Sequence, residues 1–250
     1  MKISVIMAAN NSQSTIRVAI ESFLAQTHSD KELIVIDNAS TDNTCAIVNE
    51  FNSPLISLYS ERDNGIYDGM NKGLRRISGN AFGCLNSDDC YARPDALELI
   101  ATALKDADIV SGHLHFVREH DGSPPVRIWC PELFRPGAFT RGFSLPHPST
   151  YACHTVLERV GEFSTQFRSA SDYDWLLRAL EIEGFSHAII NEVLVNMRMG
   201  GESTAGLAAI WQNSCELLKV RQNRLGSGVF DTAVILNLFK KVKQLTGSTA

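Results

Sequence analysis

The chain has 250 residues, of which 44% are hydrophobic, 20% charged and 8% aromatic. This length and composition are typical of one globular domain with an appended segment, and they exclude a fibrous or disordered chain. The 28 Asp and Glu residues outnumber the 23 Lys and Arg residues, and the resulting net charge of −5 argues against a general nucleic-acid-binding protein. The six cysteines form no C-x-x-C pair, so neither a zinc site nor a thioredoxin-like redox site is expected.

The sequence also indicates where the protein is located. The N-terminal run MKISVIMAANN lacks the charged, apolar and small-residue sections of a signal peptide. No stretch approaches the roughly 20 apolar residues of a membrane span. We therefore expect a cytoplasmic chain whose cysteines are reduced and mostly buried.

Strands and helices alternate over the first hundred residues. Short apolar runs predict strands at residues 3–8, 33–36, 55–60 and 81–85. Apolar residues at helical spacing predict helices at residues 15–26, 42–51, 66–77 and 94–105. Such alternation implies right-handed crossovers, so the predicted fold class is α/β with a mostly parallel central sheet flanked by helices.

The pattern loosens after residue 106. Further strands are expected at residues 108–117, 126–129 and 188–195, and helices at 155–160 and 172–183. Two helices, 204–225 and 229–245, are expected to close the chain. We assign residues 1–205 to one domain with halves 1–106 and 107–205, and residues 206–250 to a C-terminal helical extension.

Polar residues follow each of the four N-terminal strands. They occupy residues 9–11, 37–38, 61–63 and 86–89. Ligands of parallel sheets bind outside the carboxyl ends of the strands, where these segments should meet. The sequence therefore predicts a ligand site at that edge.

Three of these carboxylates each have two interpretations. Asp88 and Asp89 form either a polar turn or a site for Mg²⁺ or Mn²⁺, which prefer oxygen ligands. An acidic protein that binds a diphosphate needs such a cation, because bare carboxylates would repel the phosphates. Asp37 either helps to cap the following helix or accepts from a base N–H or a ribose hydroxyl.

The segment DNGIYDGMNKG, residues 63–73, places three glycines four residues apart within a helical pattern. Each glycine weakens a helix by about 1 kcal/mol relative to alanine, so helix stability does not explain them. We expect instead a close approach of this backbone to a ligand, with Asp68, Asn71 and Lys72 as contacts. Lys72 suits a phosphate, although a solvated surface lysine is the alternative.

The segment SASDYDWLLR contains a second acidic position. Ser171 is a candidate N-cap, which places Asp172 in the first turn of an amphipathic helix. The helix dipole favours an ionised carboxylate there, as a general base requires, and this effect alone also explains an Asp at that position. His147, between two prolines, is either a structural histidine or a ligand-binding one.

These motifs in this order resemble bacterial glycosyltransferase family 2, whose members have the GT-A fold. The resemblance rests on IDNASTDNT, ERDNGIYDGMNKG, LNSDD, HPSTY, SASDYDWLLR and GGES, covers residues 1–205 and weakens beyond them. It implies an inverting, metal-dependent enzyme, a hexosyltransferase or N-acetylhexosaminyltransferase. Such an enzyme moves a sugar from a nucleotide diphosphate sugar, usually UDP-linked, to an acceptor hydroxyl. Residues 1–106 would then bind the donor and residues 107–205 the acceptor.

The resemblance also assigns roles to individual residues. Asp172 would be the catalytic base and Asp89 the ligand of a divalent metal, Mn²⁺ or Mg²⁺. Asp88 would hold the ribose or donor sugar, Asp37 the nucleotide base and Asp68 the sugar nucleotide. The remaining donor contacts would be Ala9, Asn11, Asn71 and Lys72, and the candidates near the diphosphate or acceptor would be His147, Gly200 and Gly201.

The sequence departs from the family pattern at three positions, and two other functions are alternatives to a glycosyltransferase. Ala8, Asn38 and His113 differ from residues common in the family, which bears on the donor rather than on the class of reaction. A nucleotidyltransferase would need a Gly- and Arg-rich loop after the first strand, which this chain lacks. A non-catalytic partner subunit of a polysaccharide-assembly complex is the main alternative.

The expected acceptor is a glycan, and the commonest setting implied is polysaccharide assembly on a lipid carrier. Residues 229–245 form a basic amphipathic pattern that suits an anionic membrane surface, here the inner face of the bacterial inner membrane. Packing of that helix on the domain, or on a second copy in a homo-oligomer, is the alternative.

Overall fold

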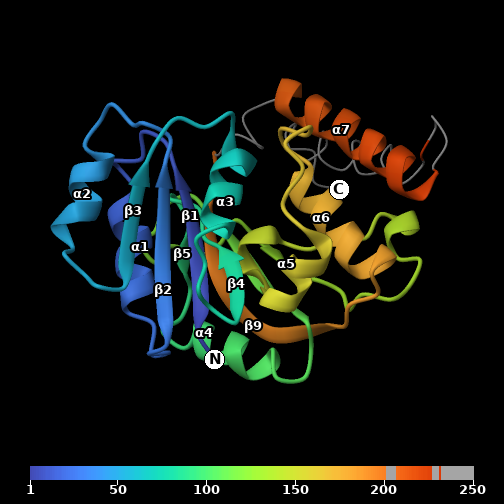
Figure 1. Ribbon diagram of the computed structural model, residues 1–250, viewed down its shortest axis with the longest axis horizontal. Coiled ribbons are helices and arrows are strands. Elements are labelled where there is room, and N and C mark those ends of the chain that lie inside the picture. The colour runs from blue at the N-terminus through green and yellow to red at the C-terminus, as the bar shows by residue number, and fades with distance from the viewer. Residues whose placement is uncertain (201–206, 227–230, 232–250) are drawn as a thin grey trace.

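One β-sheet runs through the computed structural model, which describes residues 1–200, 207–226 and 231 (Figure 1). The strand order is β3-β2-β1-β4-β8-β6-β9-β5, and β7 pairs with β6 outside this path. The strands are β1 Ile3–Ala9, β2 Lys31–Asp37, β3 Ile56–Ser60, β4 Ala81–Cys84, β5 Cys90–Tyr91, β6 Ile109–Val117, β7 Arg127–Trp129, β8 Thr150–Cys153 and β9 His187–Arg198.

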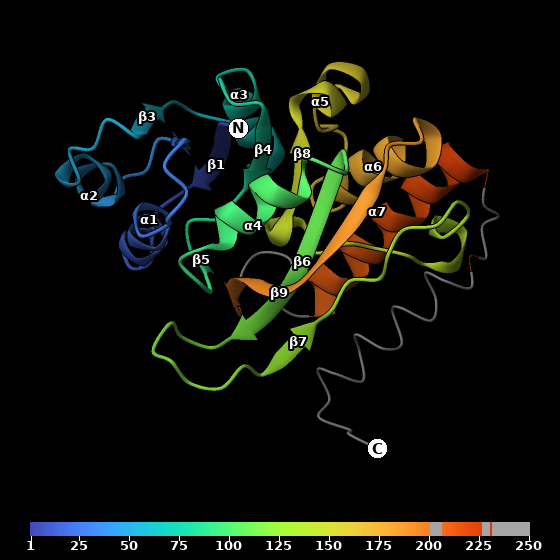
Figure 2. The same cartoon turned by 90° about the horizontal axis from the view of Figure 1, so that it is seen from below.

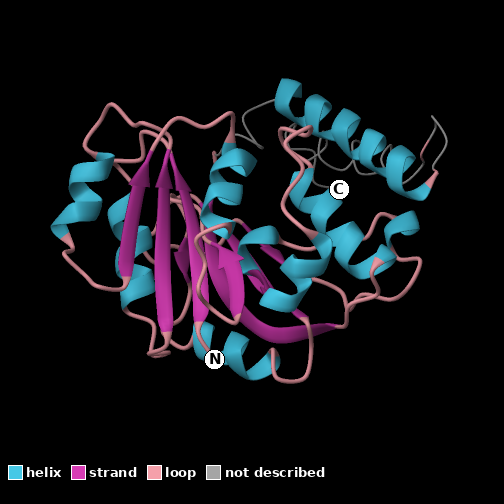
Figure 3. Cartoon of the chain, viewed as in Figure 1, coloured by secondary structure: helices cyan, strands magenta, loops and turns pink. Residues whose placement is uncertain are grey.

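Helices cover both faces of this sheet (Figure 3). The α-helices are α1 Ile16–Leu24, α2 Thr44–Glu50, α3 Ile66–Leu74, α4 Ala96–Ala103, α5 His154–Val160, α6 Ser171–Leu177 and α7 Leu207–Leu225. A π-helical turn, Arg178–Ile182, prolongs α6, and short 3₁₀ turns lie at Phe139–Arg141 and His147–Ser149. The view in Figure 2 shows α3, α5 and α6 on one side of the sheet and α1 and α4 on the other.

The predicted α/β class is confirmed. Strands β1 to β4 are mutually parallel, with Ile3 opposite Lys31 and Ala9 opposite Asp37. Each strand and helix predicted within residues 1–200 is present, with ends shifted by a few residues, and the helix expected at 204–225 is α7. The helix expected at 229–245 and the boundary between residues 205 and 206 lie outside the described residues.

Two short strands, β5 and β8, have no counterpart among the strands predicted from the sequence. β8 pairs antiparallel with both β4 and β6 and so joins the two halves of the sheet. β5 has two residues and pairs antiparallel with β9. Runs of two to four residues are too short to show a period of their own, and their partners are distant in sequence.

Side chains that alternate along the strands build two cores. On one face Ile3, Val5 and Met7 of β1 pack with residues of α1 and α4, including Phe23 and Leu97. On the opposite face lies the second cluster, formed by β1, β4, α3, α5 and α6. Burial on both faces explains why the parallel strands appear in the sequence as unbroken apolar runs.

The glycines of α3 bring this helix close to β1. A Cβ on Gly73 would lie 2.5 Å from Cγ2 of Ile6, and one on Gly69 would lie 2.9 Å from Oδ2 of Asp63. At Gly73 the close approach is therefore to the protein itself, which corrects the expectation of a ligand there, and it holds the last turn of α3 against the middle of β1. A Cβ on Gly65 would have no atom within 4 Å, so the expected approach of that part of the segment to a ligand stays a prediction.

No helix within the described part of the chain is both long and apolar enough to cross a membrane.

Candidate active site

The loops after β1 and β2 interlock at the carboxyl edge of the sheet. The Asn11 backbone N–H donates to Oγ of Ser40 at 2.8 Å, and the Thr41 N–H donates to Oδ1 of Asn11 at 3.0 Å. Asn11 and Ala39 have φ of 48° and 45°, a left-handed conformation that non-glycine residues rarely adopt. The Asn11 side chain therefore holds the second loop, and strained backbone at both loops is typical of a functional site.

Asp37 is completely buried at the end of β2 and opposite Ala9. Its carboxylate accepts hydrogen bonds from the Ser40 N–H at 3.0 Å and from Oγ of Ser60 at 2.6 Å, and Ser40 Oγ and Cys45 Sγ also donate to it. Burial alone would raise the pKa of Asp37, but these hydrogen bonds outweigh it and lower the pKa. Both oxygens thus organise the loop, but Asp37 does not cap α2, whose N-cap is Asn43 and has no side-chain capping hydrogen bond.

Asp88 and Asp89 differ in accessibility. Asp89 is 1% exposed, and its carboxylate accepts from Nδ2 of Asn86 at 2.8 Å and from the Arg198 N–H at 3.0 Å. Burial, and then the neighbouring Asp88 charge, raise the pKa of Asp89 to about 8. Asp88 is half-buried, and its backbone carbonyl lies 2.7 Å from Nε2 of His120. Burial raises the pKa of Asp88 as well, although Arg198 and His120 oppose that rise.

The carboxylates of Asp89 and Asp88 have different surroundings. Both carboxylate oxygens of Asp89 are engaged within the protein, so Asp89 positions the loop that it shares with Asp88. The Asp88 carboxylate is the more accessible of the two, and the assignment of the metal to Asp89 stays a prediction. Within the described residues no cluster of three or more His, Cys, Asp or Glu side chains could hold a metal. Mg²⁺ is often held by one or two carboxylates together with substrate phosphates, and the pair fits that arrangement.

Asp172 lies at the N-terminus of α6 and meets residues from two distant segments. The hydroxyl of Tyr67, from α3, donates to Oδ1 of Asp172 at 2.9 Å. Burial, and then the Asp172 charge, raise the pKa of Tyr67 well above its usual value. The pKa of the buried Cys84 thiol is raised to about 12, mainly by burial and further by Asp172. Asp172 therefore lies close to the carboxyl end of β4.

His147 belongs to the same cluster. Its ring packs edge-on against the ring of Phe163, with the two centroids 5.5 Å apart. The ring of Tyr67 packs against the same Phe163 ring, with a centroid distance of 5.7 Å. Burial lowers the pKa of His147, and the nearby Asp172 only partly opposes this effect. A neutral imidazole next to Asp172 can donate or accept a hydrogen bond at neutral pH.

The three α3 residues predicted to contact a donor have different surroundings. Oδ2 of Asp68 accepts the Asn64 N–H at 2.9 Å at the start of the helix, and the residue is half-buried. Asn71 is 2% exposed, and its amide makes two 2.9 Å hydrogen bonds with the backbone of Phe163. Lys72 donates to the Arg62 carbonyl at 2.5 Å. Both ends of the buried Asn71 amide are thus engaged within the protein, which favours a supporting role for Asn71, whereas the donor contact expected of Lys72 stays a prediction.

Three further residues at the carboxyl edge of the sheet were not predicted from the sequence. Tyr67 lies inside the motif that supplied Asp68, and Asn86 begins the LNSDD motif. Nothing local marks Arg198, whose backbone reaches Asp89 across 109 positions of sequence. Gly200 follows with φ of 109°, whereas Gly201 lies outside the described residues.

The arrangement of this sheet and its loops is that of GT-A glycosyltransferases. The structure of S. aureus TarS in complex with UDP-GlcNAc aligns with a TM-score of 0.69 and 17% identity, covering 98% of this chain and 73% of that one. The mannosyltransferase PcManGT from Pyrobaculum calidifontis, in complex with GDP-Man and Mn²⁺, aligns with a TM-score of 0.70 and 17% identity, covering 100% and 76%. At these identities the likeness establishes the fold.

Sequence comparison then identifies the family. Residues 4–156, more than half of the chain, match the profile of glycosyl transferase family 2, and the chain belongs to that family. Chondroitin synthase from Escherichia coli is 27% identical over 244 residues, which is 94% of this chain and 35% of that protein. Hyaluronan synthase from Pasteurella multocida is 28% identical over 208 residues, 81% of this chain and 21% of that protein. The chain thus spans about a third or less of these two relatives.

Proposed function

We propose that this glycosyltransferase moves a sugar from a nucleotide diphosphate sugar, with a UDP-sugar as donor, to an acceptor hydroxyl with inversion. The observation that carries the proposal is the Asp172 carboxylate at the N-terminus of α6, hydrogen-bonded by Tyr67 at 2.9 Å near the end of β4. The complex of TarS with UDP-GlcNAc supports the donor class.

In the proposed reaction Asp172 is the general base. Tyr67 holds Oδ1, so that the second carboxylate oxygen is available to the acceptor hydroxyl. As the acceptor oxygen forms its bond to C1 of the sugar, the hydroxyl proton passes to Asp172. The bond from C1 to the phosphate oxygen breaks on the opposite face, and the nucleoside diphosphate leaves with the electron pair. The configuration at C1 is thereby inverted.

The donor would lie across the carboxyl ends of β1, β2 and β4. Asn11, Asp37 and Asp68 line or support that edge, and His147 lies beside the base. A divalent cation, held by Asp89 next to the more accessible Asp88, would stabilise the negative charge that develops on the leaving diphosphate. The Mn²⁺ in the PcManGT complex supports this part of the proposal.

The proposed acceptor is a lipid-linked glycan in polysaccharide assembly. The names of two relatives, chondroitin synthase and hyaluronan synthase, support a polysaccharide product. Residues 1–106 would bind the donor and residues 107–205 the acceptor. We propose a cytoplasmic location, with peripheral membrane contact or a homo-oligomer contact through residues 229–245.

Thermal unfolding with UDP, GDP, dTDP and CDP, each with and without Mn²⁺, tests the donor. A nucleotide at 100 times its dissociation constant should add about 2.7 kcal/mol of stability. Stabilisation by one nucleotide only in the presence of metal would support both the donor class and the cation. If no nucleotide stabilises the protein, the alternative of a non-catalytic partner subunit is favoured.

Asp172→Asn tests the base. The variant should keep the nucleotide-dependent stabilisation and lose release of nucleotide from the donor sugar by 10²-fold or more, the scale of general-base catalysis. Asp106→Asn, which removes an exposed carboxylate at the far end of α4, serves as the matched control. Turnover by Asp172→Asn at the rate of that control would show that Asp172 is not the base.

A further inference from the structure

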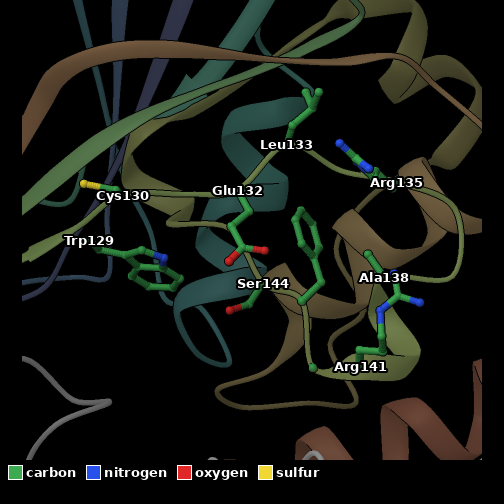
Figure 4. A pocket seen from close by; sticks show the side chains of 10 residues that line it. Trp129, Cys130, Glu132, Leu133, Arg135, Ala138, Arg141 and Ser144 are labelled. Atoms are coloured by element: carbon green, nitrogen blue, oxygen red, sulfur yellow. The ribbon is translucent and has the colours of Figure 1, made fainter.

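A pocket of ≈ 520 Å³ is lined by Trp129 of β7 and by residues of the segment that follows it, as far as Ser144 (Figure 4). No residue predicted from the sequence to bind donor, metal or acceptor lines it. Its volume falls within the range of roughly 300–1,000 Å³ typical of small-molecule sites. The side chains that matter for its chemistry are Trp129, Glu132, Arg135, Arg141 and Ser144.

Two arginines give this pocket its charge. Arg135 and Arg141 are both exposed, and neither forms an ion pair with another residue in the described part of the chain. In Figure 4 both lie on one side of the pocket. Glu132 is the other charged residue in the lining, so the lining carries a net charge of +1 from two cations and one anion. A guanidinium without a carboxylate partner can bind a carboxylate or a phosphate in a bidentate manner.

The remaining side chains suit a sugar rather than a bare anion. Trp129 lies opposite the arginines, and Glu132 and Ser144 lie between them (Figure 4). An indole ring offers a flat apolar face for the C–H groups of a pyranose, while a carboxylate and a hydroxyl accept hydrogen bonds from sugar hydroxyls. A simple inorganic anion would gain nothing from Trp129 and would be repelled by Glu132. The combination therefore favours a saccharide that carries negative charge.

The turn that carries the arginines is held firmly. The Gly137 N–H donates to Oε1 of Glu181 at 2.6 Å. Arg221 of α7 donates to the carbonyl of Thr140 at 2.9 Å and to the carbonyl of Phe139. A pocket whose wall is fixed in this way loses little entropy when it binds a ligand.

The pocket also adjoins the candidate active site. Phe139, in the turn that carries Arg141, packs against Tyr173, the neighbour of Asp172 in α6, with ring centroids 5.4 Å apart. Ser144 precedes His147 by three residues. The pocket therefore lies beside the helix that carries Asp172.

We propose that this pocket binds an anionic glycan acceptor through Arg135 and Arg141, with Trp129 against a sugar ring. The negative charge is a uronate carboxylate or a phosphodiester, which present the same chemistry to the two guanidinium groups. That the bound glycan is the acceptor rests on the proposed glycosyltransferase function. That the pocket binds an acidic saccharide does not depend on that function.

Calorimetric titration with three oligomers of similar length tests this proposal. The probes are a hyaluronan hexasaccharide with carboxylates, a hexamer of N-acetylglucosamine units joined by phosphodiesters, and neutral maltohexaose. At least one acidic probe should bind at least about tenfold more tightly than maltohexaose. Arg135→Gln and Arg141→Gln should each weaken that binding by about tenfold or more, as expected for loss of a charged hydrogen bond. Lys105→Gln, which removes an exposed positive charge after α4, should leave it unchanged.

The outcomes separate the two proposals. The acidic probe that binds identifies the source of the charge. Equal binding of maltohexaose, binding unaffected by either arginine substitution, or no binding of any probe would overturn the pocket assignment. Stabilisation by nucleotide is measured on the same variants and should persist in all of them. If acidic probes bind through the arginines but no nucleotide stabilises the protein, the pocket stands and the proposed transferase function fails.

Discussion

The side chain of Asn71 joins α3 to the segment that precedes α6. Its amide donates to the Phe163 carbonyl and accepts the Phe163 N–H, both at 2.9 Å, and the two residues are 2% and 4% exposed. Asn71→Ala would leave two buried backbone groups without partners. Each such group costs about 1–3 kcal/mol, so the variant should lose roughly 2–6 kcal/mol of unfolding free energy. The total stability of a domain is about 5–15 kcal/mol, and the loss should be easily measured.

Urea unfolding followed by tryptophan fluorescence is the appropriate assay. Trp175 reports on this region, because its ring lies 5.9 Å from that of Phe163 and its Nε1 donates to the Gly161 carbonyl at 2.7 Å. Lys72→Met, at the next position of α3, is the matched control and should change stability by less than about 1 kcal/mol. The affinity of folded Asn71→Ala for UDP should equal that of the natural sequence.

A different result would refute this reasoning. If Asn71→Ala unfolds at the same urea concentration as the natural sequence but binds UDP tenfold more weakly, the side chain contacts the donor. The assignment of Asn71 as a donor contact would then be right, and its two hydrogen bonds to the Phe163 backbone would contribute little to stability.

Three further predictions concern stability. Asp174 is fully buried between two arginines, so Asp174→Ala should cost about 3–5 kcal/mol in urea unfolding, and a loss below 1 kcal/mol would contradict a structural ion pair. Burial lowers the pKa of His187 from 6.5 to about 4, so the unfolded chain binds a proton at a higher pH than the folded protein does. The free energy of unfolding is therefore at its full value above pH 6.5, and up to roughly 3 kcal/mol of it is lost as the pH falls through 4. Urea unfolding at pH 7 and pH 4.5 should show a smaller pH dependence for His187→Gln, and equal dependence would refute this. Gly83→Ala would place a Cβ 2.4 Å from the buried Tyr151 ring and should cost about 1–3 kcal/mol, so unchanged thermal unfolding would show that the ring can move.

The sequence predicted the parallel half of the fold well because its signals are local. Apolar runs such as that of β2, and the helical spacing of Ile16, Ala19 and Phe23, are legible within a window of ten residues. β8 is different, because its four residues become a strand only between β4 and β6. Pairings over more than forty positions leave no trace in a local pattern.

Site residues were predictable by position but less so by role. The carboxylates of Asp37 and Asp88 lie at the strand ends where the sequence placed them. That Asp89 is buried beneath Asp88 depends on the Arg198 backbone, which no local pattern could foresee. In the same way, DNGIYDGMNKG shows that the segment is unusual, but only the fold shows that Gly73 packs on Ile6 and that Asn71 binds the backbone of Phe163.

The pairing of β4 with β8 limits how the chain can be divided. Residues 1–106 contain four parallel strands, and in the intact chain the outer edge of β4 is covered by β8, with Tyr151 of β8 seated on Gly83. A fragment that ends near residue 106 would expose the backbone N–H and C=O groups of that edge and an apolar face beside it. Such an edge readily pairs with another chain. Residues 1–106 expressed alone should therefore aggregate, and we expect the two halves of the sheet to fold together.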